Sequence, residues 1–143
     1  MRKGIIVIIF LMLTLFISSC AAKLTTIRPT LITSIQVENI ASGENVELLR
    51  DDNDETDWLM DDLVFQMEEF YKAAGSCGEG EEHLYNALYF MGERLELDVI
   101  INTDGSVCKN GRRYVQKEED IGPLDRSVNL EQWEECFTIH EAQ

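Results

Sequence analysis

The sequence predicts a single small α+β domain, in which an antiparallel sheet carries its helices on one face. Strand-like segments with apolar side chains at every second position flank one segment with helical apolar spacing. Asp104-Gly105 and Asn110-Gly111 are two-residue hairpin signals. The expected order of elements is β-β-α-β-β-β-β-α, which favours one sheet covered by helices.

The first predicted element is a hairpin. Residues 31–38 alternate, with Leu31, Thr33, Ile35 and Val37 on one face. A turn over residues 42–45 then leads into a second strand over residues 46–49.

A helix is expected next. Its apolar positions at helical spacing are Trp58, Leu59, Leu63, Met67, Phe70 and Tyr71. The acidic run 51–57 precedes them and suits a helix N-terminus, where carboxylates cap free N–H groups and meet the positive end of the dipole. Gly75 is the expected stop, and residues 75–82 are expected to form a loop.

The second half predicts strands over residues 84–91, 95–102, 106–109 and 112–116. Two tight turns would place Cys108 opposite Ile101, on the apolar face. A bulged first turn would place Val107 there instead, and the residues do not decide between the two.

A short final helix is expected after the charged loop 117–127. Asn129 is its predicted N-cap, and Gln132 completes a loose capping box. The helix carries Leu130, Trp133 and Phe137. Both tryptophans, Trp58 and Trp133, are expected in the core, and the alternative is an exposed anchor for a partner.

The N-terminus has the features of an export signal. Arg2 and Lys3 precede the apolar run 5–17, which is interrupted by Thr14 alone. Thirteen residues are too few for a transmembrane helix, which needs roughly 20, but they suit the apolar region of a signal peptide. Residues 1–19 are therefore interpreted as a cleavable signal.

Ile17-Ser18-Ser19-Cys20 resembles the lipobox of bacterial lipoproteins. The resemblance implies that Cys20 is diacylated and becomes the first residue, followed by a tether over residues 20–30 and an acidic domain over 31–143. It also implies attachment to the bacterial cell envelope: the outer membrane where there is one, otherwise the outer face of the plasma membrane. Two or three acyl chains hold a protein durably, whereas one does not.

Residues 31–137 also resemble small uncharacterised lipoproteins of bacterial envelopes. The resemblance lies in a hairpin, an acidic-capped helix and a meander with Asp-Gly and Asn-Gly turns. It implies no activity.

The mature chain is strongly acidic. Removal of residues 1–19 takes away two basic residues and no acid, so the net charge falls from −15 to −17. This charge disfavours nucleic acid and adhesion of the domain surface to an anionic bilayer. It favours a basic envelope protein as partner, or simply solubility.

Three cysteines remain once Cys20 is lipidated. They allow at most one internal disulfide in an exported protein. We favour Cys77–Cys108, because the glycine-flanked Cys77 can move to meet the strand that carries Cys108. Cys136 follows Trp133 at helical spacing and is expected to be buried.

No cofactor beyond the lipid on Cys20 is expected. Asp51, Asn53, Glu55 and Asp57 alternate as calcium ligands do, but the run lacks the glycine of an EF-hand loop. Helix capping is the preferred interpretation, and a zinc site at Cys77 and His83 lacks further ligands.

No nucleophile motif is present. The sequence thus favours a non-catalytic, membrane-anchored interaction domain. The alternatives are a cation- or solute-binding domain that uses residues 51–57 and, third, a small envelope enzyme.

Overall fold

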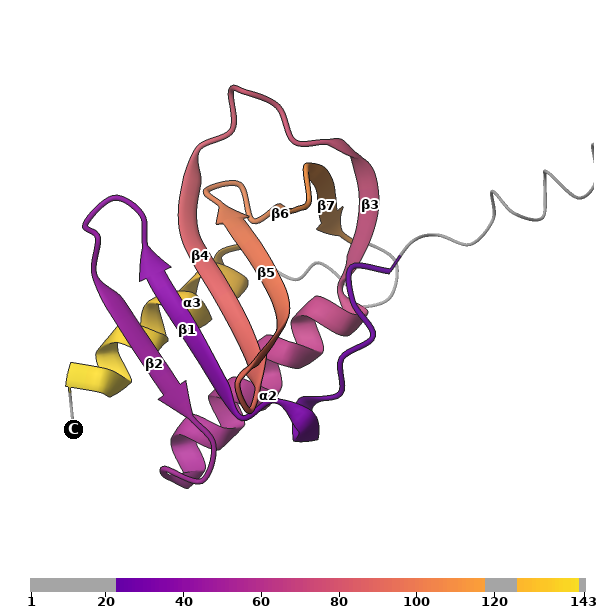
Figure 1. Ribbon diagram of the computed structural model, residues 1–143. Helices are drawn as coiled ribbons and strands as arrows, with labels where there is room; N and C mark the ends of the chain where they lie inside the picture. Colours follow the sequence, from indigo (N-terminus) through magenta and orange to yellow (C-terminus); the bar gives the residue numbers. More distant parts are fainter. Residues whose placement is uncertain (1–22, 118–125, 142–143) are drawn as a thin grey trace, which may run out of the picture.

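The computed structural model describes residues 23–117 and 126–141 (Figure 1). Two long helices and seven strands follow a single 3-10 turn. In chain order the elements are η1 (Pro29–Leu31), β1 (Ser34–Asn39), β2 (Asn45–Leu49), α2 (Asp54–Glu69), β3 (Tyr71–Ser76), β4 (His83–Met91), β5 (Arg94–Asn102), β6 (Val107–Lys109), β7 (Arg112–Gln116) and α3 (Arg126–Glu141).

The strands form one sheet in the order β2-β1-β4-β5-β6-β7-β3, and every neighbouring pair is antiparallel. Both helices lie against the same face (Figure 1). This confirms the predicted α+β class. Among the described residues, no helix has the length and apolar character needed to cross a membrane.

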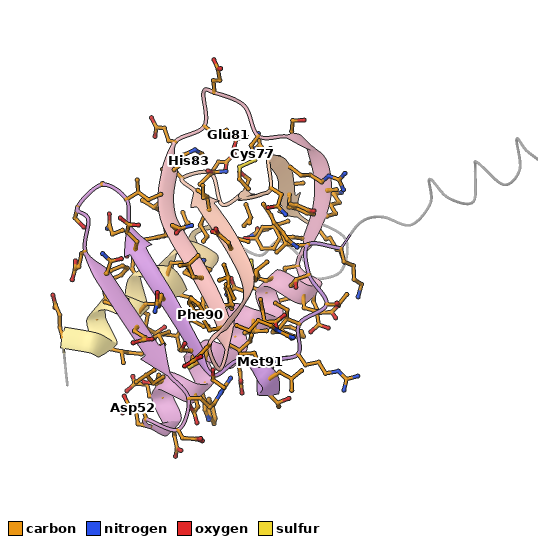
Figure 2. All side chains as sticks on the ribbon, in the orientation of Figure 1. Asp52, Cys77, Glu81, His83, Phe90 and Met91 are labelled. Carbon is orange, nitrogen blue, oxygen red and sulfur yellow. A yellow bond between two sulfur atoms is a disulfide. The ribbon has the colours of Figure 1, made fainter. Side chains whose placement is uncertain are left out.

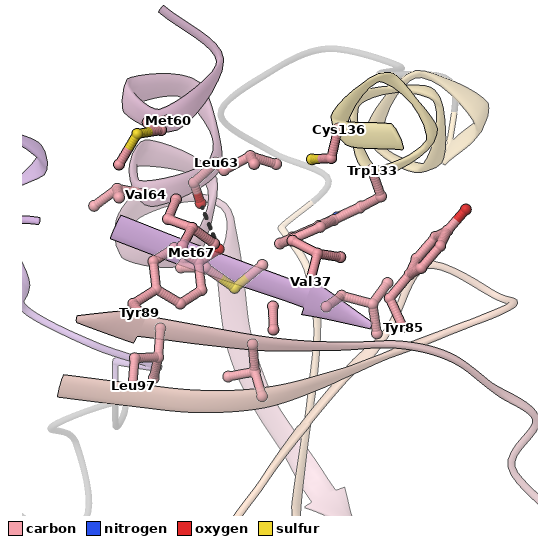
Figure 3. Packing of buried hydrophobic residues seen from close by; sticks show 14 of the residues in the cluster. Val37, Met60, Leu63, Val64, Met67, Tyr85, Tyr89, Leu97, Trp133 and Cys136 are labelled. Atoms are coloured by element: carbon pink, nitrogen blue, oxygen red, sulfur yellow. Dashed lines mark hydrogen bonds between the residues drawn. The ribbon is translucent and has the colours of Figure 1, made fainter. Parts of the chain in front are cut away.

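The core lies between this face and the helices (Figure 3). Helix α2 contributes Leu59, Met60, Leu63, Val64 and Met67, all at most 5% exposed. Their spacing of three and four residues forms one apolar stripe along the helix. The stripe packs on alternate strand residues and therefore fixes how α2 is rotated about its axis.

Two buried tyrosine hydroxyls join parts of the chain that are distant in sequence. Tyr89 Oη donates to the Leu63 carbonyl of α2, and Tyr71 Oη donates to the Gly105 carbonyl, each at 3.1 Å. Burial raises the pKa of both phenols, so both remain hydroxyl donors at neutral pH. These bonds satisfy polar groups that would otherwise be costly to bury.

The chain leaves the helix earlier than the apolar spacing predicts. Helix α2 ends at Glu69, and Tyr71 begins strand β3, which pairs with β7 at the edge of the sheet. Gly75 was expected to stop the helix, but it lies within β3 with φ +101°. Tyr71 pairs with Gln116 of β7 and is buried there. This contact between distant parts of the chain overrides the helix that the apolar spacing predicts.

The final helix also begins elsewhere than expected. Helix α3 starts at Arg126, so Asn129 lies inside it and is not its N-cap. No glycine or proline separates residues 126 and 129, so nothing prevents helical hydrogen bonding from extending upstream.

The two turns of the meander differ. Asn110 and Gly111 both have positive φ, as a tight two-residue hairpin requires. The first turn is bulged, because Val107 pairs with Ile101 and Cys108 with Ile100. The sequence allowed two registers here. The observed one places Cys108 on the face of the sheet that the helices leave uncovered.

The two tryptophans lie in different environments. Trp133 of α3 is fully buried and stacks on Tyr85 with ring centroids 6.4 Å apart. Trp58 of α2 is 76% exposed, so its expected place in the core is wrong.

Substitution of the two tryptophans should therefore affect stability to very different extents. Trp133→Ala should lower the free energy of unfolding by about 3–5 kcal/mol, because it leaves a large cavity. The control Trp58→Ala should change it by less than about 0.5 kcal/mol. Denaturant unfolding of both variants measures this, and equal losses would contradict the assignment.

Candidate functional site

A groove between the two helices surrounds Trp58. It has a volume of about 380 Å³ and is lined by residues of α2 and one residue of α3: Asp54, Glu55, Trp58, Leu59, Asp62 and Glu135. Four of these six residues are acids, and none is basic. Within the described residues, none of these four carboxylates forms an ion pair.

Helix geometry explains why Trp58 points into this groove. At 100° per residue, Asp54 and Asp62 lie about 40° from Trp58 around the helix axis, whereas Met67 lies about 180° away. Burial of Met67 against the sheet therefore turns Trp58 outward with its acids. The sequence placed Trp58 on the predicted apolar stripe beside Leu59, and the packing of α2 on the sheet decides which side chains are buried.

An electronegative groove around an exposed indole is suited to a cation. A lysine or arginine side chain can lie on the indole face while carboxylates on either side attract its charge. Phe65, 47% exposed on the same side of α2, extends the apolar surface by two turns.

Two of the four residues considered for calcium contact the start of the helix. Asn53 is the N-cap of α2, and its Oδ1 accepts the Thr56 N–H at 2.8 Å. Asp57 Oδ1 accepts the Asp51 N–H at 2.9 Å. Glu55 lines the groove. Among the described residues, no close group of three His, Cys, Asp or Glu side chains includes Asp51, Glu55 or Asp57.

Arg50 neutralises Asp57, the last acid of this run, and Asp61 in the next turn of the helix. Its guanidinium lies 2.8 Å from Asp61 Oδ1 and 3.9 Å from Asp57 Oδ1, and it also donates to the carbonyls of Pro29 and Ile32. The capping role expected for the run therefore matches its contacts, and the structure adds Arg50 as its counter-charge.

A second polar cluster lies at the end of β4 and β5, on the uncovered face (Figure 2). A disulfide joins Cys77 to Cys108. Beneath it, the buried Asn102 donates to Ser106 Oγ at 3.0 Å and to Glu81 Oε2 at 3.1 Å. Its Oδ1 lies 2.7 Å from His83 Nδ1.

The charges of Glu81 and Asp104 in this cluster are neutralised by a neighbouring arginine. Arg113 contacts Glu81 at 3.2 Å and Asp104 at 2.6 Å. Potential donor atoms of Cys77, Glu81 and Cys108 lie within 4.8 Å of one another, but the disulfide engages both sulfurs. His83 contacts Asn102 rather than Ser106, whose hydroxyl donates to Asp104 Oδ1.

Cys136 is the free cysteine of the described chain and is fully buried. Burial raises the pKa of its thiol to about 12. A thiol that stays protonated at neutral pH is a poor nucleophile.

Cys20, the expected lipidation site, lies outside the described residues. The chain matches no protein-family model, no curated protein and no solved structure.

Reduction of the disulfide should destabilise the fold. Cys77 and Cys108 are 31 residues apart, and a loop of that length corresponds to about 3–4 kcal/mol of chain entropy in the unfolded state. Chemical unfolding with and without dithiothreitol measures the loss. A Cys77→Ser/Cys108→Ser variant should not respond to the reductant, and an unchanged wild type would contradict the disulfide.

The buried thiol predicts a loss of stability at alkaline pH. The folded pKa of Cys136 lies above its ordinary value of 9.0. The unfolded chain therefore releases this proton first, and stability falls as pH rises above 9, by at most about 1.4 kcal/mol per pH unit. Cys136→Ala should show a shallower decline between pH 9 and 10, and an identical slope would refute this origin.

Proposed function

We propose that this chain is a lipid-anchored protein of the bacterial cell envelope. Its acidic domain binds a basic protein in the groove around Trp58 and catalyses no reaction. The observation that carries the binding role is the exposed Trp58 among the four carboxylates of the groove.

The exposure of Trp58 supports a binding role more strongly than net charge does. Acids scattered over a surface keep a protein soluble, and this does not require an aromatic ring. An exposed tryptophan loses the stabilisation of burial, and such aromatic residues are the common anchors of protein interfaces. Trp58 and Phe65 lie seven residues apart, about 10 Å along the helix.

The shape of the site favours a side chain over a free metal ion. A calcium ion needs six to eight oxygen ligands converging on one point. Here the acids lie on two helices around a ring. An arginine or lysine side chain uses both the ring and its flanking carboxylates.

Affinity for a labelled short arginine-rich peptide tests this role. Trp58→Ala should weaken binding about tenfold, because both the cation–π contact and the apolar contact are lost. Trp58→Phe should retain part of the affinity. Raising the ionic strength should weaken binding as the Debye length shortens.

A matched pair of charge variants separates the groove from overall charge. Asp62→Asn removes a carboxylate of the groove, whereas Asp98→Asn removes one exposed on β5. Only Asp62→Asn should lower the affinity severalfold. Two results together would refute the groove as the binding site. These are equal losses of affinity in both charge variants, and an affinity of Trp58→Ala equal to that of the wild type.

A further inference from the structure

The N-terminal segment is packed on the domain rather than extended from it. Leu24 is fully buried and Thr25 is only 8% exposed, although residues 20–30 were expected to form a tether. Lys109 Nζ donates to the Leu24 carbonyl at 2.7 Å, and Arg50 holds the carbonyls of Pro29 and Ile32. The fixed part of the chain therefore reaches as far as Leu24.

This packing limits the distance between the domain and a lipid on Cys20. Four residues span at most about 14 Å even when fully extended. The headgroup layer on each side of a bilayer is only about 5–7 Å deep. The surface beside Leu24 would therefore lie no more than about 7–9 Å beyond the headgroups.

Basic residues gather on the strands at this end of the sheet. Strands β3, β6 and β7 contain basic residues and no acid. Lys109 pairs with Arg112 across the β6–β7 turn, and Arg112 pairs with Ser76 of β3. We call Lys23, Lys72, Lys109 and Arg112 the basic pole; Arg113 is excluded, because Glu81 and Asp104 neutralise it.

The acidic groove lies away from this pole. In Figure 1 the chain toward residue 23 leaves beside β3 and β7, whereas α3 and the first turns of α2 lie on the opposite side. Helix α2 connects the two regions, and its 16 residues span about 24 Å.

We propose that the basic pole binds the anionic phospholipid headgroups of the membrane that holds the anchor, so that the Trp58 groove faces away from the bilayer. This inference rests on the proposed lipid on Cys20. Basic residues beside an anionic surface are attracted strongly enough to orient a domain that the anchor already holds there. The overall negative charge of the domain opposes contact by any other face.

Amide hydrogen exchange on the protein purified from membranes tests the orientation. The protein is reconstituted in phosphatidylcholine vesicles, with or without phosphatidylglycerol. Exchange of β3, an exposed edge strand, should be at least about fivefold slower in the anionic vesicles, as expected for even one engaged basic residue. Added sodium chloride should remove the difference.

Two variants with the same change in net charge provide the control. Lys72→Gln/Arg112→Gln alters the pole, whereas Arg94→Glu alters the exposed start of β5. The double variant should lose the slowing, and Arg94→Glu should keep it. Equal exchange of wild-type β3 in both vesicle types would overturn the basic pole.

A high-salt wash separates this outcome from failure of the anchor. A chain that stays on the vesicles but exchanges equally in both keeps its lipid and refutes the pole. A chain that washes off both vesicle types refutes the anchor. In that case, low-salt binding to anionic vesicles alone supports the pole, and equal binding to both types overturns it.

Discussion

The packing of α2 on the sheet determines both faces of that helix. Four apolar side chains of α2 are at most 1% exposed to solvent: Met60, Leu63, Val64 and Met67. Burial of each such side chain contributes roughly 1.5–3 kcal/mol. No other rotation of the helix would bury all four. The same rotation turns Trp58 outward among its acids, so the groove results directly from the core.

The strand that follows α2 forms the edge of the sheet at the end of the molecule away from the groove. Tyr71 begins β3 directly after the helix, and its buried hydroxyl bonds to the Gly105 carbonyl. Strand β3 is thereby fixed beside β7, where the basic residues gather and the N-terminal segment packs. Although the chain has a net charge of −15, strands β3, β6 and β7 contain basic residues and no acid.

Local signals predicted much of this fold. Asn110-Gly111 specifies its turn by backbone preference alone. The alternation predicted over residues 95–102 matches the buried Leu97, Val99 and Ile101 of β5, whereas Leu95 is exposed and Asn102 is buried. The α2 N-cap lies within the predicted acidic run at Asn53, because capping is a contact between close neighbours.

The features that could not be predicted depend on distant contacts. Tyr71-Lys72-Ala73-Ala74-Gly75-Ser76 shows no strand alternation, and only pairing with β7 makes it a strand. The place of Cys108 depended on whether the turn at Asp104-Gly105 was bulged, and two residues of turn sequence do not decide that. Trp58 lies next to a core residue in sequence, and only the rotation of the whole helix exposes it.

The intact mass of the protein extracted from membranes tests the central claim most directly, for the wild type and for Cys20→Ala. The account predicts a wild-type chain that begins at residue 20 and carries the added mass of two or three acyl chains. It also predicts that Cys20→Ala lacks this mass. An unacylated wild-type chain would contradict the lipid anchor and leave Cys20 as an additional free or disulfide-bonded cysteine.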